Sequence, residues 1–139
     1  MEKIEQLIPH RKPFLFVDRI ETANQEEIVG YKKYTEDEFF FAGHFPEYPV
    51  VPGVILVETM AQCGGAGVRS LGTLGEALFF LASVTKAKFK KQVQPGDEVR
   101  LVISNLRVSK RMIRQSGKAF VGEDIAAEAE WLCIVGDEP

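Results

Sequence analysis

Residues 53–71 read GVILVETMAQCGGAGVRSL, and this stretch decides the fold. Pro52 precedes it at a position that suits the start of a helix, because the proline ring holds φ near its helical value, and Gly72 follows where a helix ends. Apolar and small residues occupy almost every position, so the helix lacks the polar face that a surface helix presents to water. We therefore predict a central helix over 53–71 that the rest of the chain encloses.

Strand patterns fill most of the remaining sequence. Runs rich in β-branched and aromatic residues predict six strands, with expected ranges 14–20, 27–35, 78–89, 98–108, 113–121 and 125–135. A turn is expected at 23–25, a short helix over 2–8, and an ordered loop over 35–52, where prolines and glycine cluster. These elements predict an α+β domain with a single antiparallel six-stranded sheet wrapped around one long central helix, which is the hotdog fold.

Size and charge narrow the class of protein. The 139 residues suit one domain spanning 1–139. The formal net charge of -3 argues against nonspecific nucleic-acid binding, which needs a dense cationic surface. Residues 1–10 lack the apolar core of a signal peptide, and no stretch holds the ~18 unbroken apolar residues of a membrane span. We expect a cytoplasmic protein that binds no nucleic acid and spans no membrane.

The two cysteines, Cys63 and Cys133, lie far apart in the sequence. They show no C-x-x-C spacing, and no histidine lies near either to complete a zinc site. Their apolar neighbours indicate free, buried thiols. We expect neither a bound metal nor a cofactor.

Glu58 and Arg69 are the only charged residues between Gly53 and Ser70. Arg69 lies near the helix end, where we expect it to reach solvent and to interact favourably with the helix dipole. A carboxylate buried without a partner is so costly that the group normally keeps its proton, and a protonated carboxyl at neutral pH is suited to general-acid catalysis. Gln62, one turn on, shares its helix face. Alternatively, Glu58 lies on an exposed or dimer-facing stripe and pairs with a lysine.

The two histidines occupy different loops. His44 lies in the ordered loop before the central helix, between Gly43 and Phe45, and its titration range suits a base near neutral pH. Taken alone, however, a single histidine is more often structural than catalytic. His10 lies among prolines and basic residues, where we expect a role in loop packing.

Pro52 and Gly53 open the central helix. The free N–H groups of the first turn and the positive end of the helix dipole suit a carbonyl oxygen that gains negative charge, and glycine allows a ligand to approach the backbone. Plain helix initiation explains the same two residues equally well.

Lysines alternate with apolar residues over 86–91. In a strand this pattern places Lys86, Lys88 and Lys90 on one face, and Lys91 extends the basic patch. A solvated sheet face or protection of an edge strand accounts for the pattern, and so does docking of an acidic partner.

Three segments together resemble the signature of the 3-hydroxyacyl-(acyl carrier protein) dehydratases. They are Gly43-His44-Phe45-Pro46, Pro49-Val50-Val51-Pro52-Gly53-Val54, and Glu58 with Ala61-Gln62. The resemblance extends to 7–19 and to 86–97, and is less specific beyond Asp97. It implies the hotdog fold, obligate homodimers with composite active sites, and often a trimer of such dimers, which is a hexamer.

The resemblance also implies roles for individual residues. His44 corresponds to the catalytic base, and Glu58 corresponds to the catalytic acid contributed by the neighbouring subunit. Gly53 matches the glycine whose N–H binds the thioester carbonyl, and Gln62 matches the glutamine that steadies the acid and a water.

Further contacts with substrate are expected at Phe45, Val54 and Phe80. Phe80 occupies a position where some relatives carry a tyrosine that gates the acyl tunnel. The implied reaction is dehydration of (3R)-3-hydroxyacyl-(acyl carrier protein) to trans-2-enoyl-(acyl carrier protein) in fatty-acid biosynthesis. The acidic carrier protein is the expected partner. The surface of this chain on which it would dock combines the basic residues of 86–91 with Lys110, Arg111 and Arg114.

Two other functions fit the same fold. A hotdog thioesterase would use Glu58 to activate water, but it has no clear use for the His44 block. A non-catalytic hotdog subunit that binds an acyl chain or a partner protein needs neither residue. The presence of both His44 and Glu58 favours the dehydratase.

Overall fold

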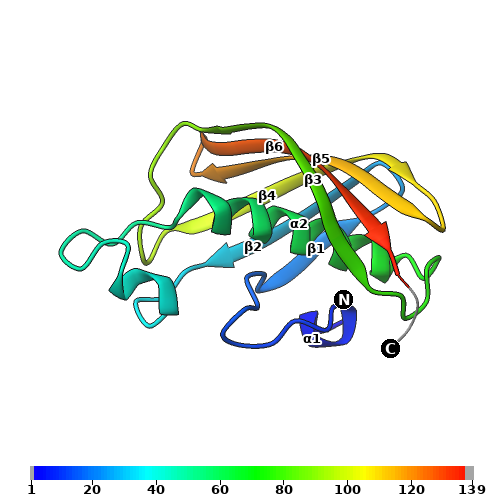
Figure 1. Cartoon of the computed structure of the whole chain (residues 1–139), viewed down its shortest axis with the longest axis horizontal. Coiled ribbons are helices and arrows are strands. Elements are labelled where there is room, and N and C mark those ends of the chain that lie inside the picture. Colours follow the sequence, from blue (N-terminus) through cyan, green and yellow to red (C-terminus); the bar gives the residue numbers. More distant parts are fainter. Residues whose placement is uncertain (1, 137–139) are drawn as a thin grey trace.

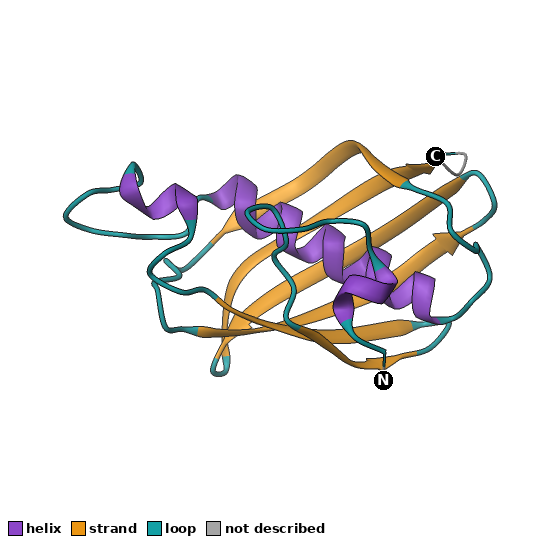
Figure 2. Ribbon diagram, turned by 90° about the horizontal axis from the view of Figure 1, so that it is seen from below, coloured by secondary structure: helices purple, strands orange, loops and turns teal. Residues whose placement is uncertain are grey.

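The computed structural model describes residues 2–136 and confirms the predicted α+β architecture (Figure 1). Its elements are α1 (Ile4–Leu7), β1 (Arg19–Ala23), β2 (Glu27–Lys33), the 3-10 helix η1 (Phe39–Ala42), α2 (Gly53–Ser70), β3 (Phe79–Phe89), β4 (Glu98–Val108), β5 (Met112–Val121) and β6 (Asp124–Val135). The strands form one antiparallel sheet in the order β1-β2-β4-β5-β6-β3. The sheet curls around α2, which is the predicted hotdog arrangement (Figure 2).

The central helix is enclosed as its composition predicts. Residues 55–68 of α2 are buried except for Glu58, and α2 contacts all six strands. Burying apolar side chains in this way is the main favourable contribution to folding. No helix within residues 2–136 is long and apolar enough to cross a bilayer.

Two glycines of α2 allow the helix to lie close to the sheet. A Cβ on Gly64 would lie 2.1 Å from Gln115 Oε1, and a Cβ on Gly67 would lie 2.5 Å from the side chain of Ile28. Gln115 is buried, and its Nε2 donates to Gly64 O at 3.2 Å while its Oε1 accepts from Trp131 Nε1 at 3.1 Å. The small residues of α2 therefore let the helix pack directly against the side chain of Gln115, whose polar atoms are all hydrogen-bonded.

The first predicted strand is wrong in position, because β1 covers Arg19–Ala23 and not 14–20. The backbone over 14–16 makes hydrogen bonds to a side chain of α2 and not to a neighbouring strand. Phe16 N donates to Gln62 Oε1 at 2.8 Å, and Gln62 Nε2 donates to Phe14 O at 3.0 Å. The turn shifts accordingly and is closed by Asn24, whose Oδ1 accepts from the backbone N–H groups of Glu26 and Glu27.

The remaining elements agree closely with the predicted ranges. The long helix ends at Ser70, and the last four strands begin or end within a residue of their expected positions. The predicted second strand ends early, at Lys33, and the predicted short helix shrinks to α1. The loop over 35–52 contains η1, which the sequence did not indicate.

Replacing Gly67 by alanine should destabilise the fold. Alanine favours a helix over glycine by about 0.8–1 kcal/mol, but the added methyl group would meet the buried Ile28, and overpacking of this kind costs about 1–3 kcal/mol. We expect a lower urea midpoint with an unchanged slope. Gly43→Ala is the matched control, because nothing lies within 4 Å of its Cβ position. An unchanged or raised midpoint for Gly67→Ala would contradict the close packing.

Candidate active site

A cavity of about 360 Å³ lies between α2, the segment that follows α1, and the start of β3. This volume is at the small end of the range for ligand-binding cavities. From α2 it is lined by Glu58, Ala61, Gln62, Gly65 and Arg69, which share one face of the helix. The rest of its lining is mostly apolar and comprises Ile8, Pro9, His10, Phe14, Leu78, Phe79, Phe80, Leu81 and Cys133.

Glu58 is held on the cavity wall by Gln62. Gln62 Nε2 donates to Glu58 Oε2 at 2.8 Å, and Gln62 Oε1 is occupied by the N–H of Phe16. Because the amide oxygen of Gln62 accepts from a backbone N–H, its NH₂ group must point toward the carboxyl of Glu58. The local fold therefore orients the carboxyl.

Glu58 is less buried than predicted, because its side chain is 21% exposed and opens onto the cavity. The alternative of an ion pair with lysine is wrong for the part of the chain that the structure describes. Among residues 2–136, the basic side chain that pairs with Glu58 is His10, whose Nε2 lies 3.8 Å from Glu58 Oε2.

His10 is the site residue that the sequence did not indicate. Burial lowers the pKa of His10, the neighbouring Arg11 lowers it further, and Glu58 opposes both by raising it. Its Nδ1 is buried without a hydrogen-bond partner among residues 2–136. Only the fold brings His10 to Glu58, since 47 positions separate them in the sequence and no periodicity relates them.

His44 lies in the loop before α2 with its imidazole oriented by the backbone. Its Nδ1 lies 3.0 Å from Val50 O, and Val50 N donates to His44 O at 3.0 Å. A carbonyl oxygen can only accept, so Nδ1 carries a proton, and in the neutral form of the ring the lone pair is on Nε2. The ring stacks on Phe45 at a centroid distance of 4.3 Å.

Gly53 begins α2 beside the end of β3. The ring of Phe89 lies 3.0 Å from the position of a Cβ on Gly53, so a larger residue would displace the ring. Ile55 N donates to Pro52 O at 2.9 Å, whereas the N–H groups of Gly53 and Val54 have no backbone acceptor within residues 2–136, as the predicted carbonyl site requires. Val54, the next residue, is 75% exposed.

The structure separates the predicted site residues into two groups. His44, Phe45, Gly53 and Val54, which we call the His44 half-site, do not line the cavity. Figure 1 shows the loop over 43–52, which carries His44 and Phe45, extending past the beginning of α2. Glu58, Gln62 and Phe80, which we call the Glu58 half-site, all line the cavity. A single chain therefore does not bring His44 to Glu58.

The prediction that Arg69 reaches solvent is wrong. Its side chain is only 9% exposed, and Nη1 lies 3.5 Å from Glu76 Oε2. Nη2 donates to Ala77 O, and the guanidinium lies 5.2 Å from the centre of the Phe79 ring. The physical reason is that the loop after α2 folds back over the helix end and covers the arginine.

Both cysteines are free and buried, as expected. Cys133 lines the cavity, and burial raises its pKa to about 11, with a further contribution from Glu58. Its thiol is therefore protonated and unreactive at neutral pH.

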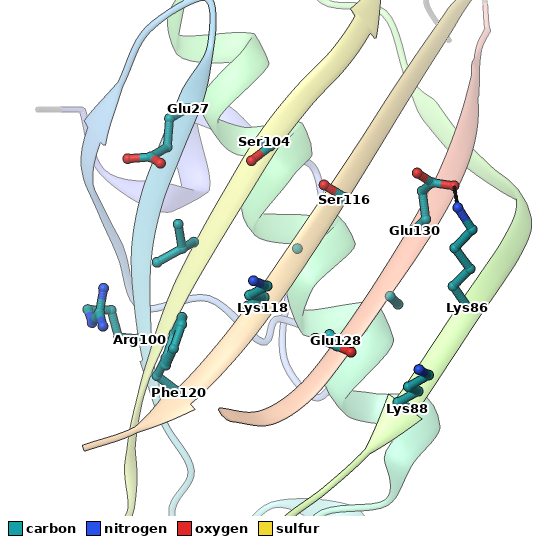
Figure 3. Close-up of a pocket in the computed structure, with 13 residues that line it drawn as sticks. Glu27, Lys86, Lys88, Arg100, Ser104, Ser116, Lys118, Phe120, Glu128 and Glu130 are labelled. Atoms are coloured by element: carbon teal, nitrogen blue, oxygen red, sulfur yellow. Dashed lines mark ion pairs between the residues drawn. The ribbon is translucent and has the colours of Figure 1, made fainter. Parts of the chain in front are cut away.

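A larger hollow of about 600 Å³ lies on the outer face of the sheet, with α2 behind the strands (Figure 3). Its lining carries charges of both signs and includes neither half-site. The predicted lysine patch borders it, and carboxylates of β6 pair with three of the four lysines. These ion pairs are Lys86–Glu130 at 3.7 Å, Lys90–Glu128 at 3.2 Å and Lys91–Asp124 at 2.9 Å.

The pKa of His10 should lie below the ordinary histidine value, and Glu58→Gln should lower the pKa of His10 further. The reason is that burial disfavours the imidazolium, while Glu58 is the one group that stabilises it. An NMR titration of the imidazole resonances measures both values, and His44→Ala leaves His10 as the single histidine and so assigns them. An upward shift in Glu58→Gln would contradict the contact.

Solved structures share the fold at low sequence identity. The dehydratase heterocomplex ApeI:P from Xenorhabdus doucetiae matches with a TM-score of 0.83 and 12% identity over 99% of this chain and 93% of that chain. A hypothetical thioesterase with coenzyme A from Streptococcus pneumoniae matches with a TM-score of 0.65 and 14% identity over 87% of this chain and 88% of that chain. At these identities the likeness establishes the fold alone.

Curated proteins found by sequence comparison are much more similar to this chain in sequence than these structures are. A protein from Desulforamulus reducens named 3-hydroxyacyl-(acyl-carrier-protein) dehydratase FabZ is 42% identical over 136 residues, covering 97% of this chain and 96% of the relative. A protein of the same name from Geobacillus thermodenitrificans is 43% identical over 140 residues, covering 100% and 97%. The family model of the FabA-like domain matches residues 8–130, and the resemblance seen in the sequence is thereby confirmed. The chain belongs to the FabA-like domain family.

Proposed function

We propose that this protein dehydrates a (3R)-3-hydroxyacyl thioester on an acyl carrier protein to the trans-2-enoyl thioester, in fatty-acid biosynthesis. The observation that carries the proposal is the carboxyl of Glu58, which Gln62 holds on the wall of a mostly apolar cavity. Such a cavity suits an acyl chain, and the oriented carboxyl suits proton transfer to a group on it. The names of the relatives that match almost the whole chain support the same reaction.

Glu58 is the general acid in this proposal. Hydroxide is a poor leaving group, so the C3 hydroxyl must receive a proton as the C3–O bond breaks. The hydrogen bond from Gln62 occupies Oε2 and leaves Oε1 without a recorded partner within residues 2–136. Oε1 is therefore the oxygen that can hold the proton and deliver it to the departing water.

His44 is the general base. The α-proton of a thioester is only weakly acidic, so its removal needs a base that is neutral near pH 7. In the neutral ring the contact between Nδ1 and Val50 O selects the tautomer with the lone pair on Nε2, which is the tautomer that such a base requires. The proton that Nε2 takes from C2 must return to Glu58 through solvent before the next turnover.

The N–H of Gly53 stabilises the charge that develops on the thioester oxygen. When the C2–H bond breaks, negative charge moves onto that oxygen, and a free N–H at the positive end of a helix stabilises it. Phe45 and Val54 would contact the substrate beside Gly53. Phe80, which is 54% exposed, lines the cavity where the acyl chain would enter.

The active site is composite, with the His44 half-site of one chain facing the Glu58 half-site of a second copy. β3 is an edge of the sheet, and every residue of it after Phe79 is exposed, including four large apolar residues, which are Phe80, Leu81, Val84 and Phe89. A long apolar edge is a ready template for pairing with another strand. The other edge, β1, is shorter and interrupted by a bulge between Ile20 and Thr22.

Pairing through β3 would also join the two half-sites. Phe80 at one end of β3 lines the Glu58 cavity, and Phe89 at the other end packs against Gly53. Antiparallel pairing of two β3 strands about a two-fold axis sets the beginning of one beside the end of the other. The homodimer would therefore contain two complete sites, and a trimer of such dimers is a further prediction from the resemblance.

The carrier protein would dock on the basic side chains that the sequence indicated. Four of them make no ion pair with another residue in 2–136 and so remain available to an acidic partner, namely Lys88, Lys110, Arg111 and Arg114. Lys86, Lys90 and Lys91 would release the carboxylates of β6 and form ion pairs with acidic side chains of the carrier instead. A cytoplasmic location, as predicted from the sequence, belongs to the same proposal.

A spectrophotometric assay tests the reaction and the roles of both catalytic residues. It uses a 3-hydroxydecanoyl thioester as substrate and follows the absorbance of the enoyl thioester product. His44→Ala and Glu58→Gln should each lower kcat by about 100-fold or more, as loss of a general base or acid does. Glu123→Gln, which changes an exposed carboxylate in the turn between β5 and β6, should leave the rate unchanged.

Full activity in either variant would contradict the assigned mechanism. Release of free thiol without any enoyl product from the wild-type protein would instead identify a thioesterase. Absence of both products with short, medium and long chains would indicate a non-catalytic subunit.

A further inference from the structure

The Glu58 cavity has a direction, because its α2 lining runs from Glu58 through Gln62 and Gly65 to Arg69. These residues lie on one face of a continuous helix, so the cavity is a groove parallel to the helix axis. The rise between Glu58 and Arg69 is about 16 Å, which an extended alkyl chain of about a dozen carbons covers. A substrate whose C3 hydroxyl meets Glu58 would therefore direct its alkyl end toward Arg69.

Arg69 stands between this groove and a second cavity of about 380 Å³. The second cavity opens beside α1 and the loop after α2, and its lining includes Glu5, Gln6 and Glu76. Four residues line both cavities and so form the partition between them, namely Ile8, Pro9, Arg69 and Leu78. Arg69 is the one member of the partition with a long charged side chain.

The guanidinium of Arg69 is held across the end of the groove. It is fixed to the loop after α2 through Glu76 and Ala77 O, and it lies over the ring of Phe79, which also lines the groove. Its Nε is buried without a hydrogen-bond partner among the described residues. An alkyl chain that pushed against this group would bury the guanidinium further, and it could supply neither a hydrogen bond nor a counter-charge.

We propose that Arg69 closes the far end of the acyl groove and restricts the protein to short and medium acyl chains. The inference rests on the proposed function, because it takes Glu58 as the position of C3. Glu76 is a positioning residue in this account, since it holds the guanidinium across the groove. The sequence offered no sign of this role, because Arg69 reads as an ordinary basic residue at a helix end.

Rates on 3-hydroxybutanoyl, 3-hydroxydecanoyl and 3-hydroxyhexadecanoyl thioesters test the proposal. In the wild-type protein kcat/KM should be at least about tenfold lower for the hexadecanoyl than for the decanoyl substrate, a difference within reach of a pocket that excludes extra methylenes. Arg69→Ala joins the two cavities and should abolish that difference, and the butanoyl rate should change least because that chain is too short to reach residue 69. Arg69→Met, which fills a similar volume without the charge, should give an intermediate ratio and guards against a folding defect in the alanine variant.

Glu76→Gln tests the ion pair that holds Arg69 against the loop after α2. It removes one charge from an exposed side chain and should raise the hexadecanoyl rate by a smaller factor than Arg69→Ala, because the guanidinium is then less firmly held. An unchanged chain-length profile in folded Arg69→Ala and Arg69→Met would overturn the proposal.

Binding of S-decyl and S-hexadecyl pantetheine, measured by calorimetry, separates this inference from the proposed reaction. These thioethers occupy the groove without reacting. If the wild-type protein forms no enoyl product but Arg69→Ala still gains affinity for the hexadecyl compound alone, the closure by Arg69 holds and the dehydratase assignment fails. If turnover is normal and neither binding nor the rate profile responds to Arg69, only the closure fails.

Discussion

An α-helix that is apolar on every face is stable in water only when other elements enclose it. In this chain α2 meets that requirement through contacts with all six strands and with α1. The few polar groups on α2 must find partners inside the protein. Thr59 lies 2.6 Å from the hydroxyl of the buried Tyr34, and Gln62 bonds the backbone of 14–16. The extended segment before β1 thus completes the enclosure where no strand covers the helix.

The same enclosure accounts for the site. Glu58 interrupts a run of buried residues, and it is tolerated because that turn of α2 faces a cavity and Gln62 supplies a hydrogen bond. One glutamine therefore serves both the fold and the site, since its oxygen holds the N-terminal segment and its nitrogen orients the carboxyl. The apolar lining suits an acyl chain for the same reason that it suits the core, and the two charged groups on α2 mark the two ends of the groove.

Much of this could be predicted from the sequence, because local patterns reflect local burial. The apolar stretch between Pro52 and Gly72 predicted α2, and runs rich in β-branched and aromatic residues predicted the last four strands to within a residue. The range 14–20 failed because its backbone partner is the side chain of Gln62, which lies far along the chain. His10 and Arg69 were misjudged for a similar reason, since a loop folds each of them against a distant part of the chain. The roles of His44 and Gly53 still rest on the resemblance and on local geometry.

If each site is shared by two chains, two inactive variants that lack different halves of the site should restore activity when they are mixed. His44→Ala and Glu58→Gln, unfolded and refolded together in equal amounts, should form mixed dimers in which one of the two sites has both an intact His44 and an intact Glu58. With random assortment about half of the dimers are mixed, so about one quarter of the wild-type rate should return. Each variant refolded alone should stay inactive. If the mixture recovers no activity although mixed dimers form, the composite site is contradicted.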